Sequence, residues 1–223
     1  MIMNYAKYID HTLLAMNATE DQIRKLCDEA KEYHFYSVCV NSGYVPLAAK
    51  LLKGSDVKVC SVVGFPLGAM LTSAKAYETE MAVKAGAEEI DMVINVGWLK
   101  SNNWEAVKQD IEAVFKSCNN VPLKVILETC LLSKEEIIKI CLICKEIGVG
   151  FVKTSTGFST SGATVEDVKL MRETVGENIG VKASGGIRDR MTAEKMVQAG
   201  ANRLGASAGI AIVSGNSTST SNY

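Results

Sequence analysis

The feature that most constrains this chain is a repeated alternation of short apolar, β-branched runs with longer amphipathic segments. Eight runs have the length and composition of buried strands, and they span residues 8–11, 37–41, 57–63, 89–95, 122–128, 150–155, 180–184 and 202–206. Segments with helical periodicity separate them, several of which open at a capping residue such as Thr19, Ser133 or Thr164 and end at a glycine such as Gly148. Strands that alternate with helices in this way form a parallel sheet with right-handed crossovers.

Eight such units predict an α/β fold in which the sheet closes into a (β/α)8 TIM barrel. The alternative, an open doubly wound sheet for a dinucleotide, is disfavoured because no G-x-G-x-x-G pattern follows the first strand. At 223 residues the chain has the size of a single barrel domain, and no linker rich in proline, glycine or serine divides it. We therefore expect one barrel domain over residues 1–213 and a flexible tail over 214–223, where the sequence SGNSTSTSNY is of low complexity.

Charge and composition narrow the class of partner. The formal net charge is −1, so neither a nucleic acid nor a strongly basic protein is the expected partner, and a small molecule is favoured. The sequence contains no run of about 18 apolar residues, so it predicts no membrane span. Lys7 and Asp10 interrupt the N-terminal segment before the apolar run of a signal peptide develops. We expect a soluble, cytoplasmic protein.

Cysteine and histidine usage points away from disulfides and metals. The seven cysteines are an odd number spread through apolar segments, which is typical of a reducing compartment where cysteine packs as a small hydrophobe. Cys141 and Cys144 form a C-x-x-C pattern, but it lies within a helical segment and is interpreted as core packing. With only His11 and His34 as imidazoles, we expect no metal and no other cofactor.

Three charged residues are placed by the strand period to face the barrel interior. Alternate strand residues point to opposite faces, and in FVKTS, GVKAS and EIDMVIN the apolar neighbours occupy the helix side. Lys153, Lys182 and Asp91 then point inward. A single such lysine is more simply explained by an error in the predicted strand register, with the lysine at a strand end in solvent. The same error would have to occur on three separate strands to explain all three residues, which makes it a poor explanation.

The chemistry of this trio follows from electrostatics. An ammonium group that is partly desolvated and close to a second ammonium has a lowered pKa, and its neutral amine is then a nucleophile near neutral pH. A carboxylate between two lysines can accept a proton and keep the second lysine charged. An amine that attacks a carbonyl forms a Schiff base, so Lys153 is the candidate for that role.

The predicted carboxyl ends of the sixth, seventh and eighth strands carry small and hydroxyl residues suited to a phosphate ester. A glycine pair alone is more often a tight turn, but barrels commonly bind phosphate at the loops after strands 7 and 8. Here these loops read ASGGIRD and GASAGIAIV, and the loop after Lys153 reads TSTGF. The candidate binding residues at this end are Thr154, Gly157, Ser184, Gly185, Gly186, Gly205 and Ser207.

Seven segments along almost the whole chain form a recognisable set, namely IDHT (9–12), SVCVN (37–41), VGFPLG (63–68), EIDMVINVG (89–97), FVKTSTGF (151–158), VKASGGIR (181–188) and RLGASAG (203–209). Together, and in this order, they closely resemble the deoxyribose-phosphate aldolase family. The resemblance implies a class I aldolase that cleaves 2-deoxy-D-ribose 5-phosphate to D-glyceraldehyde 3-phosphate and acetaldehyde without metal. It also implies that Lys153 forms the Schiff base, that Lys182 lowers the pKa of Lys153 and shares in proton transfer, and that Asp91 acts in a proton relay.

The resemblance further implies that Asp10, Thr12 and Cys39 line the pocket, that Tyr223 in the tail can donate a proton, and that the protein forms a homodimer. Asp10 could instead cap the turn after the first strand. Cys39 could be packing only, because no charged residue adjoins it in the sequence. Two other functions remain open, a transaldolase-like Schiff-base enzyme and a barrel that binds a sugar phosphate without chemistry, and the two interior lysines disfavour both.

Overall fold

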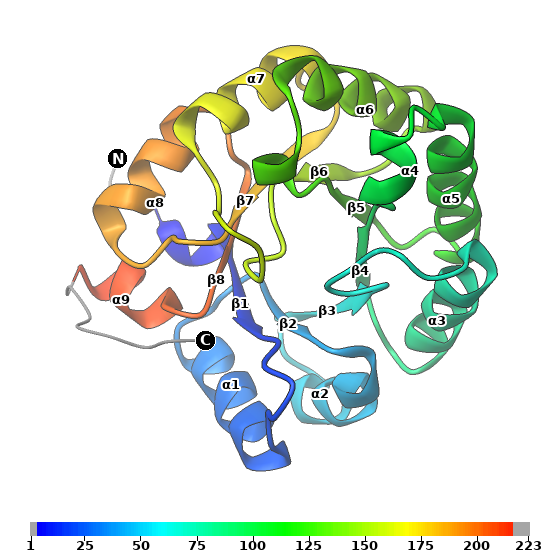
Figure 1. Ribbon diagram of the computed structural model, residues 1–223. Helices are drawn as coiled ribbons and strands as arrows, with labels where there is room; N and C mark the ends of the chain where they lie inside the picture. Colours follow the sequence, from blue (N-terminus) through cyan, green and yellow to red (C-terminus); the bar gives the residue numbers. More distant parts are fainter. Residues whose placement is uncertain (1–3, 216–223) are drawn as a thin grey trace.

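The structure of the chain is a computed structural model that describes residues 4–215. Eight parallel strands form a closed barrel in chain order, and the last strand pairs with the first (Figure 1). The prediction of a single-domain (β/α)8 barrel is confirmed. The strands are β1 (Ile9–Leu13), β2 (Ser37–Val40), β3 (Lys58–Val63), β4 (Glu89–Val93), β5 (Leu123–Ile126), β6 (Phe151–Lys153), β7 (Gly180–Ser184) and β8 (Arg203–Ala206).

Helices surround the barrel on its outside, as Figure 1 shows in a view along the barrel. Local sequence sets several of their ends. Thr19 and Ser133 each form a capping box with the third residue of the following helix, and Gly148 ends a helix with a φ of 81° that suits glycine. The α-helices are α1 (Glu20–Glu32), α2 (Val45–Leu52), α3 (Thr72–Lys84), α4 (Val96–Lys100), α5 (Trp104–Ser117), α6 (Lys134–Ile147), α7 (Val165–Val175), α8 (Arg190–Gln198) and α9 (Gly209–Ser214).

Three short 3-10 turns complete the elements of residues 4–215: η1 (Tyr5–Tyr8), η2 (Ser42–Tyr44) and η3 (Thr129–Leu131). No helix within this range is both long and apolar enough to cross a bilayer. The predicted tail begins at residue 214, and the structure assigns Ser214 to the end of α9 and Gly215 to its left-handed cap. Tyr223 lies outside the described residues.

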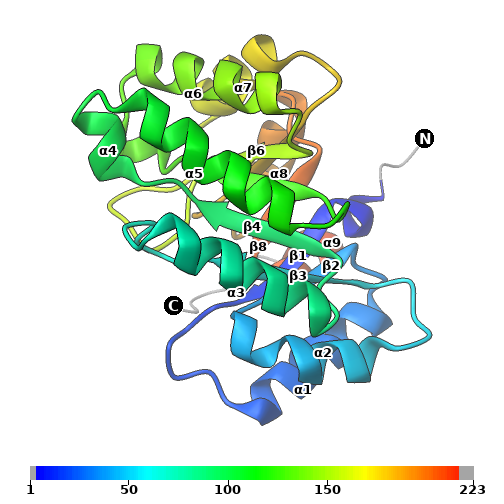
Figure 2. The ribbon, with the colours of Figure 1, turned by 90° about the vertical axis from the view of Figure 1, so that its right-hand side faces the viewer.

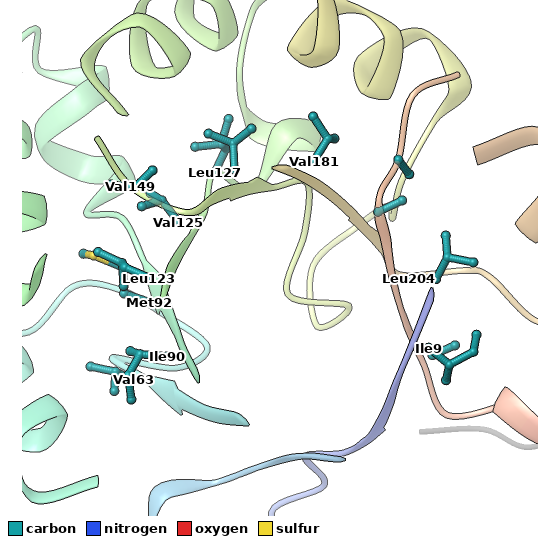
Figure 3. Packing of buried hydrophobic residues seen from close by; sticks show 14 of the residues in the cluster. Ile9, Val63, Ile90, Met92, Leu123, Val125, Leu127, Val149, Val181 and Leu204 are labelled. Atoms are coloured by element: carbon teal, nitrogen blue, oxygen red, sulfur yellow. The ribbon is translucent and has the colours of Figure 1, made fainter. Parts of the chain in front are cut away.

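The main hydrophobic core lies between the barrel and the helices. Figure 3 shows apolar side chains such as Ile90, Met92, Leu123 and Val181 on the outer surface of the strands, where they pack as one buried cluster. Because side chains alternate along a strand, the residues between them must face the barrel interior. The outer face therefore supplies the apolar burial, and the inner face is left for polar groups.

Candidate active site

Seven ionisable side chains from six strands meet inside the barrel. All are buried, at 4% exposure or less, and each faces inward because at least one adjacent strand residue belongs to the core outside the barrel. Burial of this many charges is stable only when they compensate one another. The set contains three carboxylates and four cations, namely Asp10, Glu89, Asp91, Lys124, Lys153, Lys182 and Arg203.

Asp91 on β4 is at the centre of this cluster. Its Oδ2 lies 2.9 Å from Lys153 Nζ and 2.8 Å from Lys182 Nζ, and its Oδ1 lies 2.9 Å from Lys124 Nζ. Burial alone would raise the pKa of the Asp91 carboxyl, but the three ammonium groups hold it well below its ordinary range. Asp91 is therefore an ionised carboxylate shared by three lysines.

Lys182 on β7 is held between two carboxylates. Its Nζ lies 2.6 Å from Asp10 Oδ2 and 2.8 Å from Asp91 Oδ2, with no exposed surface. Burial lowers the pKa of the Lys182 ammonium, and the charges of Asp10 and Asp91 outweigh that effect and raise it above the ordinary lysine value. Lys182 thus stays charged and can donate hydrogen bonds.

Lys153 is the last residue of β6 and contacts one carboxylate of the cluster, Asp91. Each of the other three cations contacts two carboxylates of the cluster. Lys124 contacts Asp91 and Glu89. Arg203 contacts Asp10 and Glu89, and Lys182 contacts Asp10 and Asp91. Of the four, Lys153 is therefore the cation with the fewest carboxylate contacts in the cluster.

Sequence reasoning missed Lys124, Glu89 and Arg203. Lys124 Nζ lies 2.9 Å from Glu89 Oε2, and Arg203 Nη1 lies 3.1 Å from the same oxygen. The guanidinium of Arg203 also stacks on the Tyr36 ring, 3.4 Å from its centroid. The signal was present, because each of the three lies at an inward position of its strand, next to a core residue: Lys124 lies between Leu123 and Val125, Glu89 precedes Ile90 and Arg203 precedes Leu204.

Asp10 and Thr12 lie on the inner face of β1. Asp10 is ion-paired to Lys182 and Arg203 and accepts a hydrogen bond from Ser37 Oγ at 2.7 Å. It lies within the strand and does not cap the turn after it, so that alternative is wrong. Thr12 is buried, and its hydroxyl donates to the carbonyl of Asp10 at 2.8 Å.

The loops after β6 and β7 pack against each other. The amide of Ala163 donates to the carbonyls of Ser184 and Gly185 at 3.0 and 3.1 Å. A Cβ on Gly162 would lie 2.2 Å from the Gly185 oxygen, so this close approach requires glycine. Three of the predicted glycines here have positive φ: 85° at Gly157, 85° at Gly185 and 79° at Gly186.

The predicted hydroxyl residues beside these loops already have protein partners. Thr154 Oγ1 accepts from the Ser184 amide at 3.1 Å, and Ser184 Oγ donates to the Ser155 carbonyl at 2.8 Å. Both therefore brace the carboxyl ends of β6 and β7. Ser207 follows β8 and is exposed, one residue ahead of the cap of α9.

Gly205 was a candidate phosphate-binding residue at the carboxyl end of the strand expected over residues 202–206. It lies inside β8, where a Cβ would meet Ser184 Cβ at 2.9 Å and Lys182 Cε at 3.1 Å. A side chain at this inward position would occupy the space that the Lys182 chain takes. Gly205 therefore makes room for Lys182.

A pocket of about 160 Å³ lies among the loops that follow β3, β4, β5 and β6. Glu128, with a φ of 57°, extends its carboxylate there and accepts hydrogen bonds from the Thr156 hydroxyl at 2.5 Å and the Thr156 amide at 3.2 Å. Glu128 thus positions the loop that follows Lys153. The lining residues are Pro66, Leu67, Val93, Val96, Glu128, Leu131, Thr156, Phe158 and Ser159.

Cys39 lies beside Cys60 on the inner face of the barrel, close to Asp91. The neighbouring Cys60 thiol lowers the pKa of the Cys39 thiol, against the effect of burial, and the Lys182 ammonium adds to the lowering. Charged groups therefore lie near Cys39 in space, although none adjoins it in the sequence. The candidate ligand atoms of Cys39, Cys60 and Asp91 lie within 4.8 Å of one another, but the three ammonium groups on Asp91 oppose a bound cation.

Comparisons with known proteins agree with this fold. The chain matches the DeoC/LacD family aldolase model over residues 5–217. It is 47% identical to a structure described as a deoxyribose-phosphate aldolase from Coccidioides immitis, with a TM-score of 0.92 and coverage of 95% of this chain and 85% of that one. It is 43% identical to an aldolase called QR15, with a TM-score of 0.91 and coverage of 96% of both chains. A tetrameric deoxyribose phosphate aldolase from Aeropyrum pernix is 34% identical, with a TM-score of 0.88 and coverage of 94% of this chain and 89% of that one.

Proposed function

Because the chain belongs to the DeoC/LacD family of aldolases, we propose that it is a class I aldolase that acts through a Schiff base on Lys153. The proposed substrate is 2-deoxy-D-ribose 5-phosphate, cleaved to D-glyceraldehyde 3-phosphate and acetaldehyde. The observation that carries this proposal is the contact of Lys153 with Asp91, whose same oxygen also contacts the charged Lys182. A nucleophilic amine, a proton acceptor and a proton donor thus lie within one hydrogen-bonded group.

In the proposed first step, the Lys153 amine attacks the C1 aldehyde of the open-chain sugar. The carbinolamine then loses water and leaves an iminium. Asp91 accepts the proton that the nitrogen releases on attack and passes it to the alkoxide oxygen, and Lys182, which holds its proton, donates a second proton to the departing hydroxyl. The iminium replaces the ammonium charge that Lys153 can carry, so the cluster keeps its carboxylates paired.

The iminium is the electron sink for cleavage. The C3 hydroxyl loses its proton, through a water held by Asp91 and Lys182, and the C2–C3 bond breaks. D-Glyceraldehyde 3-phosphate leaves, and the remaining enamine carbon takes up a proton. Hydrolysis of the second iminium frees acetaldehyde and regenerates Lys153.

We place the phosphate of the substrate at the glycine loops that follow β7 and β8. The positive φ values of Gly185 and Gly186 support this assignment, because such backbone can turn its amides toward an anion. Exposed Ser207 offers a hydroxyl at the neighbouring strand end. Tyr223 is proposed as the proton donor to the enamine carbon, and it lies outside the described residues.

Assembly and location stay proposals. We propose a homodimer in the cytoplasm, while the relative from Aeropyrum pernix is a tetramer. Size-exclusion chromatography with light scattering distinguishes the two assemblies. The rival functions are a transaldolase-like enzyme and a barrel that binds without chemistry, and the experiment below separates both from the proposal.

Borohydride trapping tests the proposed function directly. The protein is incubated with 2-deoxyribose 5-phosphate and borohydride, and its peptides are mapped by mass spectrometry. We expect a reduced two-carbon adduct on Lys153, with Lys124 as a matched interior lysine that stays unmodified. An adduct on Lys182 would overturn the assignment of roles, a three-carbon adduct formed with ketose phosphates only would favour the transaldolase-like enzyme, and no adduct would favour the binding barrel.

A further inference from the structure

Cys39 on β2 and Cys60 on β3 lie opposite each other on neighbouring parallel strands. Both are fully buried, and both belong to a small interior cluster with Leu14, Val62 and the partly buried Phe65. Their sulfur atoms lie within 4.8 Å of each other. Adjacent strands are about 4.8 Å apart, which falls within the Cα separations of about 4.4–6.8 Å that a disulfide can bridge.

The two thiols differ in reactivity. The neighbouring Cys60 thiol lowers the pKa of Cys39, and the ammonium groups of Lys182 and Lys153 add to this effect. Burial, together with the neighbouring Cys39 thiol and the charge of Asp91, raises the pKa of Cys60 well above the ordinary thiol value. A thiolate is the nucleophile in thiol oxidation, so Cys39 is the attacking sulfur and Cys60 the resolving one.

The C-x-x-C pattern on α6 is a useful contrast within the same chain. Cys141 and Cys144 are buried in the core between the barrel and the helices. Burial raises the pKa of Cys141 to about 12 and raises that of Cys144 well above the ordinary value. Their sequence spacing suggests redox chemistry, but an apolar environment without a cation makes both thiols unreactive.

We propose that Cys39 and Cys60 are a peroxide-sensitive thiol pair whose oxidation to a disulfide reversibly inactivates the enzyme. The Cys39 thiolate attacks hydrogen peroxide, the O–O bond breaks, and Cys39 becomes a sulfenic acid while hydroxide leaves as water. The Cys60 sulfur then attacks the Cys39 sulfur, the S–O bond breaks, and a second water leaves with the Cys60 proton. Two thiols are oxidised by two electrons as one peroxide is reduced to two waters.

Inactivation follows from the contacts of Cys60 with the ion cluster. The Cys60 thiol donates to Asp91 Oδ1 at 3.1 Å and accepts from Lys124 Nζ at 3.3 Å. A disulfide has no S–H to donate, so Asp91 loses one of its four contacts and the Lys124 ammonium shifts with it. The loss of activity as a readout rests on the proposed function. The access of peroxide to the buried Cys39 rests on it too, because an interior that admits a sugar phosphate to Lys153 also admits a peroxide.

Peptide mapping of the oxidised protein tests the proposal on the unaltered chain. The reduced protein is treated with hydrogen peroxide, free thiols are alkylated in denaturant, and the peptides are sequenced by mass spectrometry. We expect a linked pair of peptides that contain Cys39 and Cys60, an activity loss of about tenfold or more, and recovery of activity with dithiothreitol. Half-exposed Cys130 reports the peroxide dose, and Cys141 and Cys144 should remain alkylated.

Two variants sharpen the result. In Cys60→Ala, the Cys39 sulfenic acid has no resolving thiol, so peroxide should oxidise it further to a sulfinic acid that dithiothreitol does not reverse. Cys141→Ala is the matched control and should respond to peroxide as the parent does. Full alkylation of Cys39 and Cys60 at a dose that oxidises Cys130 would overturn the proposal, as would reversible inactivation of Cys60→Ala. Mapping needs no aldolase activity, so a failure of the proposed function is seen separately.

Discussion

Replacing Asp110 by alanine should destabilise the barrel strongly, because the change leaves a buried lysine without its carboxylate. Lys75 on α3 and Asp110 on α5 are both fully buried, and Lys75 Nζ lies 2.6 Å from Asp110 Oδ2. Lys75 also donates to the carbonyl of Val93 at 2.9 Å, and Asp110 Oδ1 accepts from Thr72 at 2.9 Å. Figure 2 shows β4 between these two helices, so the pair ties them to the end of the strand that carries Asp91.

The magnitude follows from the burial of the pair. Removing one partner of a buried ion pair costs about 3–5 kcal/mol, because the other charge remains unpaired. For a domain of this length each kcal/mol lowers Tm by about 2–4 °C, so a fall of about 6–20 °C is expected. The matched control is Asp56→Ala, whose partner Lys7 is exposed, and that change should leave Tm close to that of the parent because an exposed ion pair contributes little to stability.

The penalty should depend on pH. Burial lowers the pKa of Lys75, and Asp110 opposes that lowering. In Asp110→Ala only burial remains, so the folded variant releases the lysine proton at a pH where the unfolded chain still holds it. Stability then rises with pH up to the ordinary lysine pKa of about 10.4, and the penalty is largest near neutral pH and below.

Urea unfolding of the parent and the variants at several pH values measures the stability penalty of Asp110→Ala and its dependence on pH. The double variant Lys75→Met, Asp110→Leu removes both charges and should unfold within about 1 kcal/mol of the parent, since apolar replacement of a buried pair is often neutral. A cost below about 1 kcal/mol for Asp110→Ala at neutral pH would refute the reasoning. A penalty that does not change with pH would show that the lost carboxylate acts through packing and not through the charge of Lys75.

Three further predictions concern the ion cluster. Gly205→Ala should lower kcat by about tenfold and stability by about 1–3 kcal/mol, because the new Cβ would lie 3.1 Å from Lys182 Cε. Steady-state kinetics and thermal unfolding measure the two effects, and a normal kcat would contradict the prediction. Lys124→Met should lower kcat while borohydride still traps Lys153, since Lys124 contacts Asp91 Oδ1 and Lys153 contacts the other oxygen. An unchanged kcat would leave Lys124 a purely structural residue. Stability should fall with acid below about pH 4, because the pKa values of Asp10 and Asp91 are lowered in the folded state and protonation favours the unfolded chain. Acid titration of the free energy of unfolding measures this, and a flat profile between about pH 4 and 2 would contradict it.

The strands and the direction of their side chains were predictable because both depend on local sequence. The period of two in FVKTS, GVKAS and EIDMVIN places Lys153, Lys182 and Asp91 on the inner face, and the structure brings them together. Lys124 in PLKVILE carries the same signal and was overlooked. The glycine loops after β6 and β7 and the strand that contains Gly205 were also recognisable from local sequence, while the close approach of Gly205 to Lys182 was not.

Partners inside the barrel were decided only by the tertiary structure. Strand period tells which face a side chain occupies, but contacts across the interior depend on how eight strands are staggered around the closed sheet. Asp10 and Lys182 are 172 positions apart and yet lie 2.6 Å apart as an ion pair. For the same reason the reactive cysteine pair is Cys39 with Cys60, joined by strand register, and not the C-x-x-C of α6, which the sequence alone displays.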